Sequence, residues 1–287
     1  MMDLGDAMKQ FEAELERAGV SSPRANVEWI ACATLGLSRA ELSLKAAERG
    51  FTPEPGQLEE IRARVHRRAA REPLQYILES TSFCGIEIKV APGVLIPRPE
   101  TELLAEAGWK FLQKRQEPTA LDFCSGSGCI SLSLALYAPE SRIWGVELSI
   151  EALRIAWTNA TRYELDGRIR TMEGDCPTAA REGAPFDLVI SNPPYIPSAE
   201  IERLEPEVSL HEPSVALDGG PDGLRFYRLL AKEAPELLKP DGVLMAEFGD
   251  GQFPQIEEIF RTAGWERIRA EKDYSGKERF FVASQPK

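Results

Sequence analysis

The spacing of hydrophobic positions changes near residue 119. From there to the C-terminus, short apolar runs alternate with longer stretches whose apolar positions repeat at helical spacing. Such alternation is typical of an α/β fold, in which helices cover a mostly parallel sheet. The pattern predicts strands over residues 119–123, 142–147, 168–173, 186–191, 242–248, 265–271 and 279–284. It predicts helices near residues 129–138, 149–162, 223–238 and 252–263.

Residues 1–78 have a different, helical pattern. Ser38 and Glu41 have the spacing of a capping box, which predicts the start of a short helix. A later stripe predicts a helix with one buried face and consists of Leu58, Ile61, Val65 and Ala69. Two short apolar stretches on either side of Cys84-Gly85 predict a hairpin. We therefore expect a small helical domain over residues 1–78, a hairpin linker over 79–98 and an α/β domain over 99–287.

The predicted strand over residues 186–191 is followed directly by Asn192-Pro193-Pro194-Tyr195. The two prolines fix φ and lack N–H groups, so the loop offers mainly acceptors: the Asn192 side-chain oxygen and nearby backbone carbonyls. An amide or amino-purine nitrogen carries two hydrogens that need acceptors, and Tyr195 offers a flat face for stacking. The tetrapeptide therefore indicates a pocket for a planar group bearing NH2. The alternative is an ordinary turn, because Asn-Pro dipeptides also mark strand exits.

A glycine-rich turn follows the predicted strand over residues 119–123. The segment Asp122–Gly128 contains two glycines, which let the backbone approach a ligand closely. Glu147 ends the next strand, where a carboxylate can accept both hydroxyls of a ribose, and Asp175 follows a third strand. Ligands of such sheets bind beyond the carboxyl ends of the strands, so we expect these residues and Asn192 on one rim. The alternative for Glu147 is a solvated strand end.

These motifs resemble those of class I S-adenosylmethionine-dependent methyltransferases. Three further strings narrow the resemblance: Arg71–Ile77, Val94–Glu102 and Ala216–Leu224. Together they are similar to the protein-(glutamine-N5) methyltransferases that modify peptide chain release factors, over residues from about 20 to about 284. The resemblance implies a seven-stranded, mostly parallel Rossmann-like methyltransferase sheet of order 3-2-1-4-5-7-6. It also implies that the N-terminal helical domain recognises the substrate and that residues 99–287 form the methyltransferase domain.

The resemblance implies S-adenosylmethionine as cofactor and, as acceptor, the side-chain amide of a glutamine in the Gly-Gly-Gln motif of a release factor. The cofactor-binding residues that it implies are Asp122, Cys124, Ser125, Gly126, Ser127, Gly128, Glu147, Asp175, Cys176 and Asn192. The implied catalytic residues are Asn192, Pro193 and Tyr195, and the substrate site adds Pro194, Pro97 and Arg98. Cys124 stands where many such enzymes have glycine, and its side chain is tolerated if its φ is negative. No metal is expected.

Other readings stay open. The acceptor could be a glutamine of a ribosomal protein, or a base amino group such as adenine N6 in a nucleic acid. A non-catalytic module that only binds the cofactor is a further alternative. The formal net charge of −12 argues against nucleic acid, because binding to phosphates usually shows a basic footprint. The densest run of basic residues consists of Arg62, Arg64, Arg67, Arg68 and Arg71. It is interpreted either as the solvated side of a helix or as a docking surface for a partner.

The composition also bears on location. Five scattered cysteines form no Cys-x-x-Cys pair, which favours reduced thiols and a cytosolic setting. The acidic start, Met1–Gly19, is unlike a signal peptide, and no apolar run approaches the roughly 18 residues of a membrane span. We therefore expect a cytoplasmic protein whose partners are release factors, with neither membrane association nor direct nucleic-acid binding.

Overall fold

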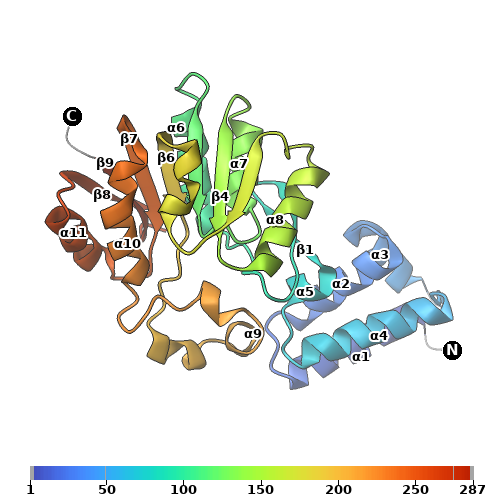
Figure 1. Ribbon diagram of the computed structural model, residues 1–287. Helices are drawn as coiled ribbons and strands as arrows, with labels where there is room; N and C mark the ends of the chain where they lie inside the picture. The colour runs from blue at the N-terminus through green and yellow to red at the C-terminus, as the bar shows by residue number, and fades with distance from the viewer. Residues whose placement is uncertain (1–2, 49, 274, 285–287) are drawn as a thin grey trace. The chain divides into compact units, whose positions relative to one another are not determined.

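The computed structural model describes residues 3–48, 50–273 and 275–284. The chain forms two compact units (Figure 1). The helical unit comprises the residues up to Ser80 together with Glu205–His211, and the α/β unit comprises Thr81–Leu204 and the residues from Glu212 onward. Within the described ranges, no helix is both long and apolar enough to cross a membrane.

The helical unit is built from amphipathic helices that share one core. Its helices are α1 (Leu4–Arg17), α2 (Pro23–Leu35), α3 (Arg39–Ala47), α4 (Pro55–Ala69), α5 (Leu74–Leu78) and the short α9 (Pro206–Ser209). The predicted capping box is confirmed, because Ser38 and Glu41 bond reciprocally at the start of α3. The predicted stripe on α4 is confirmed too: Ile61 and Val65 are fully buried, and Leu58 and Ala69 pack against the same core.

The basic run on α4 and after it is not simply a solvated face. Arg68 is only 5% exposed, and its Nη2 donates to Glu207 Oε1 over 2.7 Å. Arg71 donates from Nε and Nη2 to the two carboxylate oxygens of Glu207, over 2.8 and 2.6 Å. Arg67 binds Glu72 in the same bidentate manner. Arg68 and Arg71 therefore hold the segment Glu205–His211 on the helical unit.

The α/β unit begins with a two-stranded sheet of β1 (Ser80–Phe83) and β2 (Ile86–Lys89), followed by α6 (Thr101–Leu112). Its main sheet contains β3 (Thr119–Phe123), β4 (Arg142–Glu147), β5 (Ile169–Glu173), β6 (Phe186–Ser191), β7 (Leu238–Glu247), β8 (Arg267–Lys272) and β9 (Glu278–Ser284). The order is β5-β4-β3-β6-β7-β9-β8; β9 pairs antiparallel with both β7 and β8, and the other described strand pairs are parallel. The predicted seven-stranded order is confirmed.

Helices α7 (Cys129–Tyr137), α8 (Ile150–Arg162), α10 (Arg225–Glu233) and α11 (Phe253–Thr262) connect the strands (Figure 1). β6, in the middle of the sheet, is buried along its whole length, as expected when helices cover both faces of a parallel sheet. Two predicted boundaries were wrong by four residues or more. α10 ends at Glu233, because Pro235 cannot continue a helix. β7 begins four residues early, at Leu238, since it pairs with Phe186 across a register shift.

Candidate active site

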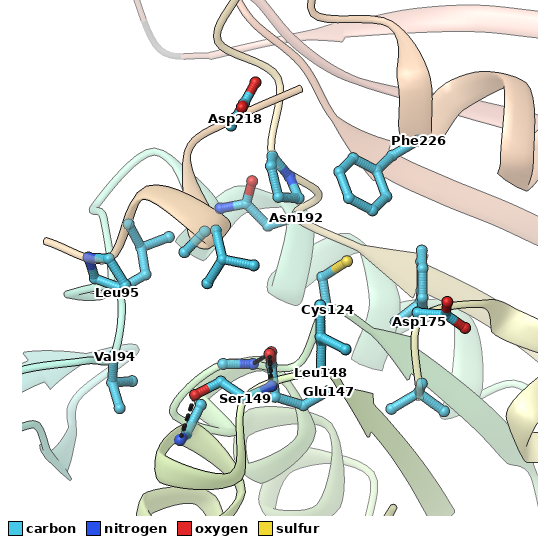
Figure 2. A pocket seen from close by; sticks show the side chains of 18 of the residues that line it. Val94, Leu95, Cys124, Glu147, Leu148, Ser149, Asp175, Asn192, Asp218 and Phe226 are labelled. Carbon is cyan, nitrogen blue, oxygen red and sulfur yellow. Dashed lines mark hydrogen bonds between the residues drawn. The ribbon is translucent and has the colours of Figure 1, made fainter. Parts of the chain in front are cut away.

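One pocket lies at the carboxyl ends of four neighbouring strands. Each strand end contributes lining residues: Cys124 and Gly126 after β3, Glu147 and Leu148 at β4, Gly174 and Asp175 after β5, and Asn192 and Pro194 after β6. Figure 2 shows Cys124, Glu147, Asp175 and Asn192 around this pocket. Parallel strands place their carboxyl ends on one edge, so residues 70 positions apart in sequence meet here.

The loop after β3 turns sharply to expose its backbone to the pocket. Gly128 has a φ of +78°, and a Cβ placed there would lie 3.2 Å from that of Ala156, so glycine is required for both reasons. Cys124 has a φ of +62°, so the condition under which its side chain is tolerated without strain is not met. The turn is imposed by the next residue, because Ser125 N donates to Val146 O over 3.1 Å and draws the chain toward β4. A cysteine therefore occupies a left-handed conformation that favours glycine.

Glu147 is held rigidly in the pocket by backbone donors. Its Oε2 accepts from Gly126 N and its Oε1 from Ser149 N, both over 2.9 Å (Figure 2). A carboxylate offers about four lone-pair sites, so two remain for further donors. The arrangement suits a vicinal diol, which presents two hydroxyl protons side by side.

Several predicted cofactor-binding residues support the loop without lining the pocket. Asp122 is fully buried, and its Oδ2 accepts from Ser131 N and Oγ over 3.0 and 2.7 Å. Burial raises the pKa of Asp122 to about 7, against the effect of the Ser131 bonds. Three buried polar atoms here have no hydrogen-bond partner within the described ranges: Asp122 Oδ1, Ser125 Oγ and Ser127 Oγ. Cys176 Sγ lies 3.4 Å from Thr178 Oγ1. Direct roles of these residues and of Gly128 in cofactor binding stay predictions.

Asn192 is fixed by a hydrogen-bonded chain that sequence reasoning missed. Its Nδ2 donates to Thr101 Oγ1 over 3.0 Å, and the Thr101 hydroxyl donates to Glu247 Oε2 over 2.6 Å. Thr101 and Glu247 are 2% and 3% exposed. A signal for Glu247 did exist, because it ends β7 and so reaches the same rim as Glu147. Thr101 lies within the segment Val94–Glu102, which supported the family resemblance, but the sequence offered no reason to assign Thr101 a role.

The Tyr195 hydroxyl also donates to Glu247, over 3.3 Å to Oε1. Burial and the adjacent Glu247 carboxylate raise the pKa of Tyr195, so the phenol stays protonated and cannot serve as a base near neutral pH. Neither Tyr195 nor Pro193 lines the pocket with its side chain. Their predicted catalytic roles, including stacking of Tyr195 on an amide, stay predictions.

A further wall of the pocket comes from two segments that are tied together. Val94 and Leu95 line it on one segment, and Pro213, Val215, Ala216 and Asp218 on the other. Arg98 Nη2 donates to Glu212 Oε1 over 2.5 Å. The Glu212 side chain is 1% exposed, and burial raises its pKa in spite of Arg98. Pro97 and Arg98 are not among the lining residues, so their predicted contact with substrate stays a prediction.

The pocket is acidic. Among the described residues that line it are the carboxylates of Glu147, Asp175 and Asp218 but a single cationic side chain, Arg225. A carboxylate for a diol, a glycine loop and an excess of negative charge fit S-adenosylmethionine, which has a ribose, a sulfonium and an ammonium group. The fold and site together define a class I S-adenosylmethionine-dependent methyltransferase.

Comparisons with known proteins agree. Residues 6–78 match the PrmC N-terminal domain, and residues 100–204 match the methyltransferase small domain. The release factor glutamine methyltransferase of Geobacter sulfurreducens is 43% identical over 88% of this chain and 86% of its own length. That of Moorella thermoacetica is 36% identical over 98% of both chains. The chain belongs to the release factor glutamine methyltransferase family, which confirms the resemblance of its motifs.

Solved structures support the same fold at lower identity. The hMettl16 catalytic domain, in complex with an RNA hairpin, has a TM-score of 0.60 at 15% identity over 78% of this chain and 82% of its own. A Thermus thermophilus ribosomal RNA methyltransferase in complex with its cofactor and guanosine has a TM-score of 0.51 at 21% identity, over 72% of this chain and 50% of its own. At these identities the likeness establishes the fold alone.

Proposed function

We propose that the protein transfers a methyl group from S-adenosylmethionine to the side-chain amide nitrogen of a glutamine in a peptide chain release factor. The observation that carries the proposal is the fixed amide of Asn192 in the same pocket as Glu147. The names of these curated relatives support release factors as the substrate class. A Gly-Gly-Gln motif is the proposed target sequence.

At the cofactor end, Glu147 would accept the ribose hydroxyls through its two remaining lone-pair sites. Asp175 and the loop after β3 would lie beside the rest of the nucleoside and the amino-acid portion. The excess of carboxylates in the lining would offset the positive charge of the cofactor. When bound, S-adenosylmethionine supplies a methyl group already activated by its sulfonium.

At the acceptor end, the chain must position a poor nucleophile. Asn192 Oδ1 and the backbone carbonyl of Pro193 would accept hydrogen bonds from the two amide hydrogens of the substrate. Fixing the amide plane aligns the nitrogen with the methyl carbon. The same acceptors would stabilise the positive charge that develops on nitrogen in the transition state. Tyr195 would pack near the amide as a neutral phenol.

The division of labour between the two units is also proposed. A glutamine side chain offers too few contacts to select one protein, so residues 1–78 would dock the release factor and the hairpin over 79–98 would link them to the methyltransferase domain over 99–287. The net charge of −12 supports a protein substrate over a nucleic acid. Such a substrate implies work in the cytoplasm, where translation takes place.

A methyl-transfer assay with labelled S-adenosylmethionine tests the proposal. Purified release factor, ribosomal protein and nucleic acid are offered separately, and mass spectrometry locates the modified residue. We expect one methyl group on one glutamine of the release factor, and methylation slower by about 10²–10³ with the Asn192→Ala variant. Methylation of a ribosomal protein or of a nucleic acid, with the release factor left unmodified, would refute the proposed substrate.

A further inference from the structure

A buried chain of polar groups stands behind Asn192. Thr101 lies at the first turn of α6 and Glu247 at the end of β7, so two elements distant in sequence meet behind the loop after β6. Asn192 Nδ2 donates to Thr101 Oγ1, and Thr101 donates to Glu247 Oε2 over 2.6 Å, a length typical of a hydroxyl bound to a carboxylate. Tyr195 donates to the other carboxylate oxygen.

The charge on Glu247 fixes the direction of this chain. An ionised carboxylate only accepts, so the single proton of the Thr101 hydroxyl must point toward Glu247. Thr101 Oγ1 can then only accept a hydrogen bond from Asn192, so the NH2 of the Asn192 amide must face it. The Asn192 oxygen is left with no hydrogen-bond partner within the described ranges. It is free to accept from a substrate.

The reversed amide is disfavoured by the same geometry. If Asn192 Oδ1 faced Thr101, two oxygens would meet, or Thr101 would turn its proton away from the buried Glu247. Losing a hydrogen bond to a charged group corresponds to about a ten- to hundredfold change in population. An amide turned this way would present NH2 to the substrate, which suits a carboxylate and repels a glutamine NH2.

We infer that Thr101 and Glu247 are positioning residues that orient Asn192, and that they set the preference for a glutamine amide over a glutamate carboxylate. This inference rests on the proposed function, in which Asn192 Oδ1 accepts from the substrate NH2. Neither residue touches the reacting atoms; both act through Asn192.

The assay conditions follow from the surroundings of Glu247. Burial raises its pKa to about 7, opposed by the bonds from Thr101 and Tyr195; Glu100 adds to the rise and Arg279 opposes it. At about pH 8.5 the carboxylate is ionised and the chain has the polarity described. All variants are therefore compared at that pH.

The test compares Thr101→Val with Thr101→Ser in the full-length protein. Valine keeps the shape and removes the hydroxyl, whereas serine keeps the hydroxyl. We measure single-turnover methylation of the release factor at saturating S-adenosylmethionine, and cofactor affinity by calorimetry. We also measure binding of the release factor and of its Gln→Glu form, changed at the glutamine that wild-type enzyme methylates.

With Thr101→Val we expect turnover to fall by about tenfold or more, cofactor affinity to stay within about twofold, and preference for the glutamine form to fall by about tenfold. Thr101→Ser should keep wild-type turnover and preference. A role in stability alone would lower the melting temperature without changing the preference. Unchanged preference in a folded Thr101→Val variant would overturn the inference.

Glu247→Gln gives a second test that does not depend on folding of Thr101→Val, because it removes a buried charge without changing volume. A glutamine can donate as well as accept, so it no longer dictates the direction of the Thr101 proton. We expect a smaller preference for the glutamine form, and a wild-type preference would overturn the inference. If wild-type enzyme leaves the release factor unmethylated, the proposed function itself is refuted.

Discussion

The ion pair of Glu207 with Arg68 and Arg71 should make the helical unit sensitive to acid. Burial opposes ionisation of Glu207, but the bonds from Arg71 and Arg68 outweigh it and lower the pKa from 4.5 to about 2. Its side chain is 14% exposed, so solvent screens the pair little. A shift of this size corresponds to about 3 kcal/mol of stability.

The sign follows from the depressed pKa. The stabilisation is complete above the unfolded-state pKa of 4.5 and is lost as pH falls toward the folded-state value of about 2. Less than half of it should remain at about pH 3. Glu207→Gln should therefore destabilise the helical unit by about 3 kcal/mol at neutral pH, and by progressively less as the solution is acidified.

Hydrogen exchange of the α4 amides, read by mass spectrometry, reports the stability of the helical unit alone. Wild type and variant are compared at the same pH, so the intrinsic exchange rate cancels. Glu205→Gln is the matched control, because it removes one charge from an exposed position of the same segment and should cost less than about 0.5 kcal/mol. A wild-type-minus-Glu207→Gln difference that stays constant from about pH 7 to about pH 3 would refute this reasoning.

Three predictions concern the pocket. Glu147→Ala should weaken S-adenosylmethionine binding about ten- to a hundredfold. It should also lower the melting temperature of the free protein, because Gly126 N and Ser149 N lose their acceptor. Calorimetry that shows wild-type affinity would remove Glu147 from the site. Asn192→Ala should lower single-turnover rates by about 10²–10³, and Asn192→Asp should lower them less, since aspartate keeps an acceptor oxygen. Normal rates in both variants, with a loss of about 1 kcal/mol of stability, would instead show that Asn192 serves to form the turn. Cys124→Gly should leave cofactor affinity unchanged and raise the free energy of unfolding by up to about 1 kcal/mol, because glycine adopts a φ of +62° without strain. A lower melting temperature would show that packing of the thiol outweighs the strain.

Local signals account for much of the fold. The bounds of β3, β4 and β6 follow from short apolar runs that end at turn residues, and the order of the sheet follows from the family resemblance. The rim of the pocket was predictable for the same reason, because residues that follow parallel strands must share an edge. The early start of β7 was not, since the register shift opposite Phe186 depends on the neighbouring strand.

The sequence by itself determined the alternation of strands and helices, the glycine turn and the acceptor-rich loop at Asn192, because each depends on residues close together in the chain. Only the tertiary structure decided which partners complete them. Thr101 meets Glu247 across 146 positions, and Arg68 meets Glu207 across 139. The left-handed turn at Cys124 is likewise imposed by β4, through the bond from Ser125 N to Val146 O. A buried polar group must find a partner wherever the fold brings one, and no local pattern encodes that choice.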